Sequence, residues 1–129
     1  MIDKERRRMG SFRKEYYVRY TLIFLLTAFI VYIRFILEGK SFLWLSDGTD
    51  QHYTALAWFG QYLREYIAGI FTKGEVTLPQ WSFSLGVGDD IITTLHYYCI
   101  GDPLDLLAVF FDPEATEWLY TFLILLRLY

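Results

Sequence analysis

The sequence contains a single cysteine, Cys99, so the chain cannot form an internal disulfide and is not a disulfide-stapled scaffold. It also lacks a CxxC pair, a phosphate-binding Walker loop, a dinucleotide-binding glycine fingerprint and the residue order of a Ser-His-Asp triad. It has no internal repeat and no low-complexity tract, and apolar and polar residues alternate too little for a β-sheet. These absences leave the common soluble enzyme classes unsupported and favour a chain of helices and loops. Because no reactive motif accompanies Cys99, we expect it to be buried and inert.

Apolar and aromatic residues are abundant instead. Of the 129 residues, 54% are hydrophobic and 20% are aromatic, which fits a membrane protein better than a soluble domain. Residues 1–19 carry seven Lys and Arg against three Asp and Glu, whereas residues 20–129 carry five against twelve. A basic segment next to an apolar run is better explained as a cytoplasmic anchor than as a nucleic-acid-binding site. We therefore expect no nucleic-acid partner.

The longest apolar run, residues 17–37, has the length of a transmembrane helix. About 20 helical residues cross roughly 30 Å of hydrocarbon. A signal peptide would have a shorter apolar core and a small-residue cleavage site, and the following Gly39-Lys40-Ser41 is a poor match, so the span is expected to be retained. By the positive-inside rule, residues 1–16 form a cytoplasmic basic tail and residues 38–116 are extracytoplasmic. The basic cluster that sets this orientation is Arg6, Arg7, Arg8, Arg13 and Lys14.

The outer segment, residues 38–116, is expected to contain amphipathic helices. Leu56, Phe59 and Leu63 recur at helical spacing and predict a helix over residues 49–71, with Asp47 or Thr49 as its N-cap. Glycines and a proline predict a long loop over residues 72–90. A second helical segment follows over residues 90–100, and Asp102-Pro103 opens a third. We expect these helices to lie on the membrane interface with their aromatic faces down.

A second apolar segment, residues 117–129, is too short to cross a bilayer. It is expected to be the start of a second transmembrane helix in a longer multi-span protein. The predicted fold class is therefore an all-α membrane protein. It has one N-terminal transmembrane helix, an extracytoplasmic helix-and-loop segment with interfacial helices, and a truncated second transmembrane helix.

Four polar residues, Asp47, Asp50, Gln51 and His52, lie inside the aromatic stretch LWLSDGTDQHYTALAW. An aspartate beside a glycine commonly serves as a turn or helix cap. A carboxylate just outside a membrane span can also act as a general base toward an acceptor hydroxyl, or hold a divalent cation that neutralises a phosphate leaving group. We take Asp47 and Asp50 as candidate catalytic residues and Gln51 and His52 as candidate substrate-binding residues. The Asp-x-x-Asp spacing is too common to assign a metal site.

A second group of candidate substrate-binding residues follows in the chain. Asp89 and Asp90, in a glycine-rich loop, form either a solvated turn or a site for sugar hydroxyls or a cation. Trp81 is either an interfacial anchor or a stacking surface for a sugar ring. His96 lies in an aromatic run, where interfacial packing is the simpler role.

The ordered set SDGTDQHY, LPQWSFSLGVGDD and YYCIGDPLDLL, after a basic amino terminus and one span, resembles the amino-terminal part of YfhO-family bacterial membrane proteins. These proteins are related to the GT-C glycosyltransferases, and the resemblance runs from about Tyr17 to the last residue. It implies an essential aspartate in the first outer loop, facing a lipid-linked sugar donor. By position this role falls on Asp47, with Asp50 as the competing candidate. The resemblance also implies that Asp89 or Asp90 lies near the same site.

The resemblance implies a membrane glycosyltransferase that moves a sugar from a polyprenyl-phosphate donor to a cell-envelope acceptor such as teichoic acid. The expected partners are the lipid bilayer, the polyprenyl-phosphate-linked sugar and the envelope polymer. The expected location is the extracytoplasmic face of the bacterial cytoplasmic membrane. Two alternatives stay open: a membrane scaffold or transport subunit whose acidic loop binds a partner or a cation, and an inactive gene remnant. The 129 residues alone are expected to be inactive.

Overall fold

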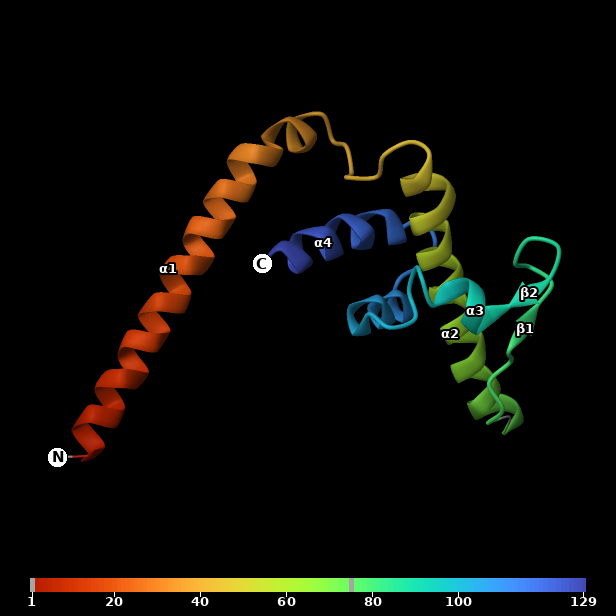
Figure 1. Cartoon of the computed structure of the whole chain (residues 1–129), viewed down its shortest axis with the longest axis horizontal. Helices are drawn as coiled ribbons and strands as arrows, with labels where there is room; N and C mark the ends of the chain where they lie inside the picture. Colours follow the sequence, from red (N-terminus) through yellow and green to blue (C-terminus); the bar gives the residue numbers. More distant parts are fainter. Residues whose placement is uncertain (1, 75) are drawn as a thin grey trace. The chain divides into compact units, whose positions relative to one another are not determined.

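A computed structural model of the chain describes residues 2–74 and 76–129, with side chains described from Arg13 onward. Arg6, Arg7 and Arg8, which contribute to the predicted orientation, lie outside the described side chains. The chain divides into two compact units, residues 1–40 together with 125–129, and residues 41–124. Both are mainly helical (Figure 1).

The first unit is dominated by one long helix, α1 (Ile2–Leu37). Its part from Arg13 to Leu37 has 25 residues and contains an 18-residue window with a mean hydropathy of 2.2, so it is long and apolar enough to cross a membrane. Apolar side chains such as Leu22, Ile23 and Ile30 are exposed along it. A helix with apolar residues around its whole circumference needs an apolar surrounding, as a membrane span has. The prediction of a helix suited to membrane crossing over residues 17–37 is thus confirmed. The same helix, α1, also includes residues of the basic tail that precede this span.

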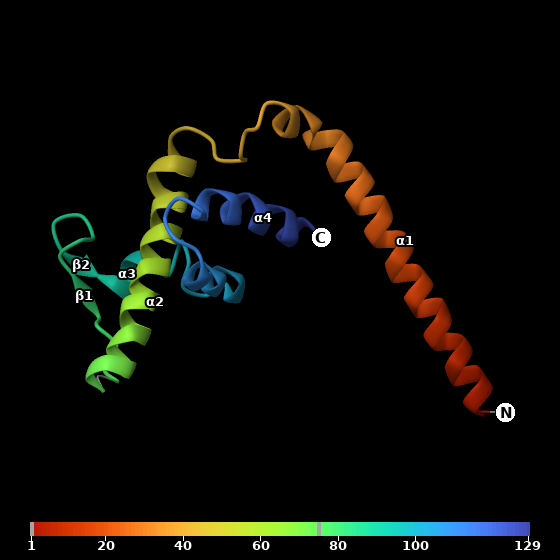
Figure 2. The ribbon, with the colours of Figure 1, turned by 180° about the vertical axis from the view of Figure 1, so that it is seen from behind.

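The second unit is arranged around α2 (Thr54–Lys73), which follows directly on a π-helical turn, η1 (Gly48–Tyr53). The short strands β1 (Trp81–Ser82) and β2 (Asp89–Asp90) and the helix α3 (Ile91–Leu95) lie on one side of α2 in both views (Figures 1 and 2). The 3-10 helix η2 (Pro103–Phe110) packs along α2, and α4 (Thr116–Leu128) follows. The helix predicted over residues 49–71 is confirmed. It ends at Gly74, whose left-handed φ of 69° suits glycine.

Two expectations for this unit need correction. The strands β1 and β2 pair antiparallel, with Trp81 opposite Asp90 and Ser82 opposite Asp89, so the outer segment is not purely helical. Strands of two residues are too short to produce a recognisable alternation. Asp47 stands at the capping position of η1, but its side chain makes no capping hydrogen bond, and the hydroxyl of Thr49 donates to the carbonyl oxygen of Trp44 at 2.8 Å.

Aspartate caps begin the helices α3 and η2. Asp90 Oδ1 accepts from the backbone N–H of Thr93 at 2.6 Å, and Asp102 Oδ1 accepts from that of Leu104 at 2.9 Å. Such bonds satisfy the free N–H groups of a first helical turn. The prediction that Asp102-Pro103 opens a helix is confirmed, and the helix is of the 3-10 type. The segment over residues 90–100 is helical only to Leu95, after which turns follow.

The core of the second unit is formed by apolar side chains of α2, α3, η2 and α4. Burying one Leu or Ile side chain contributes about 1.5–3 kcal/mol. Gly60 lets α2 approach η2 closely, because a Cβ there would lie 2.5 Å from the carbonyl oxygen of Ala108. Arg64 fixes the same contact by donating from Nη1 to the carbonyl oxygens of Ala108, at 3.0 Å, and Phe111. Cys99 is 3% exposed, so its predicted burial is confirmed. The other buried core members are Ala55, Leu56, Phe59, Tyr62, Ile91, Leu95, Leu119, Tyr120 and Leu123.

The helix expected over residues 117–129 is present as α4, and its residues Leu119, Tyr120 and Leu123 belong to the core of the second unit. Within residues 2–74 and 76–129, α1 is the one helix with the length and composition of a membrane span. A membrane crossing by α4 therefore stays a prediction.

Candidate functional site

The carboxylate of Asp47 is held by a chain of two hydrogen bonds. Gln51 Nε2 donates to Asp47 Oδ1 at 3.0 Å, and Tyr98 Oη donates to Gln51 Oε1 at 3.0 Å. Because the Tyr98 hydroxyl donates to the amide oxygen of Gln51, the amide nitrogen of Gln51 faces the carboxylate of Asp47. Asp47 is exposed, and its Oδ2 has no hydrogen-bond partner among the described residues. One carboxylate oxygen is thus fixed while the other can accept a proton or a hydrogen bond from a ligand.

Aromatic rings surround this chain of hydrogen bonds. The half-buried ring of His52 lies edge-to-face against Tyr98, with centroids 5.5 Å apart, and 6.2 Å from the ring of Trp44. Trp44 in turn packs under Gly48, where a Cβ would lie 2.9 Å from its ring. His52 therefore supports Tyr98 by ring packing, and its predicted contact with a substrate stays a prediction.

Asp50 and Gln51 both line a small cavity of about 230 Å³. Thr54 and Trp58 continue this wall along the start of α2. The opposite wall comes from the loop around Ser84 and from Tyr98. Because Gln51 also binds Asp47, the cavity adjoins the hydrogen bonds that hold this carboxylate. Two predicted site residues, Asp50 and Gln51, thus line the same cavity.

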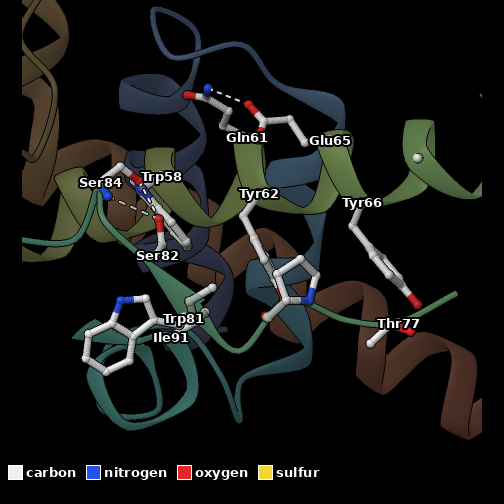
Figure 3. A pocket seen from close by; sticks show the side chains of 12 residues that line it. Trp58, Gln61, Tyr62, Glu65, Tyr66, Thr77, Trp81, Ser82, Ser84 and Ile91 are labelled. Carbon is white, nitrogen blue, oxygen red and sulfur yellow. Dashed lines mark hydrogen bonds between the residues drawn. The ribbon is translucent and has the colours of Figure 1, made fainter. Parts of the chain in front are cut away.

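A larger cavity of about 450 Å³ lies between α2 and the segment from Thr77 to Ser84 (Figure 3). The rings of Trp58 and Tyr62 stack in it, with centroids 5.3 Å apart and an interplanar angle of 14°. Trp81 lines the cavity from the facing segment, as its predicted role in ligand stacking requires. Trp58 and Ser84 line both cavities, and Trp58 Nε1 donates to Ser84 Oγ at 2.9 Å.

Tyr62 is buried at the base of the larger cavity. Its hydroxyl donates to the carbonyl oxygen of Pro79 at 2.7 Å, which joins α2 to the facing segment. Burial raises the pKa of this hydroxyl, with a smaller contribution from Tyr66. The phenol therefore stays protonated and serves as a fixed donor and an apolar surface.

The remaining candidates have structural partners of their own. The hydrogen bond from the backbone N–H of Thr93 lowers the pKa of Asp90, because it stabilises the ionised carboxylate. Asp89 Oδ1 accepts from the backbone N–H of Asp90 at 2.8 Å. His96 Nδ1 lies 2.6 Å from the carbonyl oxygen of Thr93. None of the three lines either cavity, so their predicted contacts with a substrate stay predictions.

Sequence reasoning missed Tyr98, Trp58 and Ser84 as members of the site. Trp58 follows Gln51 by seven residues, and this two-turn helical spacing is a signal that they share a face. Tyr98 lies 47 positions beyond Gln51, and Ser84 lies 26 beyond Trp58. No local pattern predicts such contacts.

The described residues contain no group of three or more His, Cys, Asp or Glu side chains that could hold a metal ion. Divalent cations such as Ca²⁺ take several oxygen ligands at once. A divalent cation bound by fewer side chains together with a substrate phosphate, as the acidic loop suggested, stays a prediction.

An apolar helix of membrane-span length, followed in the chain by a mainly helical second unit, indicates a membrane protein. A family described as bacterial membrane protein YfhO matches residues 20–129. The chain belongs to this family, which confirms the resemblance and its membrane location. Neither the curated proteins nor the solved structures give a match.

Proposed function

We propose that the chain forms part of a membrane glycosyltransferase that transfers a sugar from a polyprenyl-phosphate donor to a cell-envelope acceptor, such as teichoic acid, on the extracytoplasmic face. The observation that carries this proposal is the carboxylate of Asp47. Gln51 and Tyr98 hold one of its oxygens and leave the other exposed. Family membership and an apolar helix ahead of this carboxylate support the membrane setting.

In the proposed reaction Asp47 is the general base. Its Oδ2 takes the proton of an acceptor hydroxyl while the hydroxyl oxygen bonds to the anomeric carbon of the donor sugar. The bond from that carbon to the phosphate oxygen breaks, and polyprenyl phosphate leaves with the electron pair. The tail of the leaving group stays in lipid, so the base must work at the membrane surface. Asp50, in the adjoining cavity, binds the acceptor or the donor sugar.

The test replaces Asp47 by Asn at the chromosomal gene, so that any segments encoded beyond this chain stay in place. Asn keeps the size of the side chain and its bond to Gln51 but cannot accept the proton. General base catalysis contributes about 10²–10⁴ in rate, so the transfer of sugar to the envelope polymer should fall by a factor in that range. Glu114→Gln removes one negative charge at another exposed position and is the matched control. Wild-type envelope glycosylation in the Asp47→Asn strain would show that Asp47 is not the base.

A further inference from the structure

The larger cavity takes no part in the chemistry proposed at Asp47. We propose that it binds an uncharged sugar residue of the acceptor glycan, seated on the face formed by Trp58 and Tyr62. The source of the glycan rests on the proposed function, whereas the binding itself is a property of this chain and does not require transfer.

The aromatic residues of the cavity provide the apolar surface that a sugar ring needs. Trp58 and Tyr62 lie one helical turn apart on α2, and their nearly parallel rings stack with centroids 5.3 Å apart. Trp81 comes from the opposite segment and is 56% exposed, so its ring is available to a ligand (Figure 3). A volume of about 450 Å³ lies within the usual range of small-molecule pockets, roughly 300–1,000 Å³.

Polar side chains on the rim match the hydroxyl groups of a sugar. Ser82 Oγ and Ser84 Oγ lie 2.8 Å apart on the segment that faces α2. On α2 itself, Gln61 Nε2 donates to Glu65 Oε1 at 2.8 Å. Hydroxyl, amide and carboxylate groups supply both donors and acceptors. A site that orients a small ligand usually combines a mainly apolar surface with a small number of fixed polar groups.

The charge of the cavity excludes an anionic occupant. Among the described residues that line it, Glu65 is the charged one, and none is Lys, Arg or His. A phosphate or carboxylate would be repelled there by the carboxylate of Glu65, and no cationic side chain among the described lining residues would offset this repulsion. The sugar in this cavity is therefore uncharged, and the donor phosphate binds elsewhere.

The two cavities share a wall, so a glycan bound in the larger cavity can extend toward the smaller one. Trp58 and Ser84 separate the aromatic cavity from the cavity that contains Asp50 and Gln51. A sugar residue on the aromatic face thus lies next to the space that Asp50 and Gln51 line. The glycan chain is anchored in the larger cavity, and its next residue reaches the smaller one.

Binding is measured on the full 129-residue chain in lipid nanodiscs, because sugar-headed detergents would compete. The probes are maltotriose, chitotriose and β-1,4-galactotriose, each followed by saturation-transfer NMR up to tens of millimolar. At least one should bind, and Trp81→Ala should weaken its binding about tenfold. Trp118→Ala is the matched control, since Trp118 is also 56% exposed but lies on α4 outside the cavity. Absence of binding by all three probes, or equal loss in both variants, overturns the proposal.

Two further arms separate the other outcomes. If choline binds better than the sugars and Glu65→Gln abolishes this, the cavity is a cation site and the proposal is wrong. If a sugar probe binds but Asp47 proves dispensable for sugar transfer, the proposed function is wrong and this inference stands. If Asp47 is essential for transfer but no probe binds, this inference is wrong and the proposed function stands.

Discussion

The hydroxyl of Tyr98 donates to the side-chain oxygen of Gln51 at 3.0 Å, although 47 positions separate the two residues. The bond links the turn after α3 to the turn before α2. It also decides which end of the Gln51 amide faces Asp47. A residue that makes no direct contact with the candidate base thus sets its surroundings.

Replacing Tyr98 by Phe should lower the rate of sugar transfer without a change in acceptor KM. The phenyl ring keeps its packing against His52, but the Gln51 amide loses the bond that orients it. A hydrogen bond contributes about 0.5–1.5 kcal/mol, so the expected loss in kcat is up to roughly tenfold. Tyr97→Phe is the control, because the hydroxyl of Tyr97 has no hydrogen-bond partner among the described residues and its side chain is exposed. Equal rates in the two variants would contradict a positioning role for Tyr98.

Gly60→Ala should destabilise the second unit, although alanine is the better helix former. Propensity alone predicts a gain of roughly 0.5–1 kcal/mol from this change. The new Cβ would lie 2.5 Å from the backbone oxygen of Ala108, which cannot move without displacing η2. Overpacking of this kind costs about 1–3 kcal/mol. Thermal unfolding followed by near-ultraviolet circular dichroism gives the sign of the change, and a raised Tm would refute the close approach of the two helices.

The cap of α3 should make the local stability of this helix depend on pH in the acid range. The N–H of Thr93 lowers the pKa of Asp90 in the folded chain, so the ionised carboxylate favours folding. This contribution is complete above the ordinary pKa of an aspartate and is lost as the pH falls through the lowered value. The amide resonance of Thr93, followed by NMR during acid titration, should move with this transition. Asp90→Ala should abolish it, whereas Asp89→Asn should leave it in place.

Helices and their starts were predictable where the signal is local. Leu56, Phe59 and Leu63 repeat at the helical period and identify α2, and the Asp102-Pro103 pair marks the start of η2. The two-residue strands gave no period to detect. Asp47 has the residue type of a cap, but Gln51 one turn later binds its carboxylate instead. Competition of this kind between two local partners depends on the backbone geometry, which the π-helical turn changes.

The candidate site was predictable only in its acidic half. Asp47, Asp50 and Gln51 stand close together in the sequence and therefore remain close in the fold. Tyr98 and Ser84 come to them through tertiary packing, which a single sequence does not encode at short range. The two cavities share a wall for the same reason, and this relationship supports a role for Trp58 that its sequence position alone does not suggest.

The predicted orientation can be tested by thiol labelling, because the native cysteine is protected. Cys99 is 3% exposed, so a membrane-impermeant maleimide should react mainly with an introduced cysteine. Leu45→Cys places a thiol at a position that is 87% exposed and two residues before Asp47. We expect labelling of this variant in intact cells, whereas Lys14→Cys, in the basic tail, should react only after the membrane is permeabilised. The reverse pattern would put Asp47 in the cytosol, where a base cannot meet a sugar donor carried on the outer leaflet.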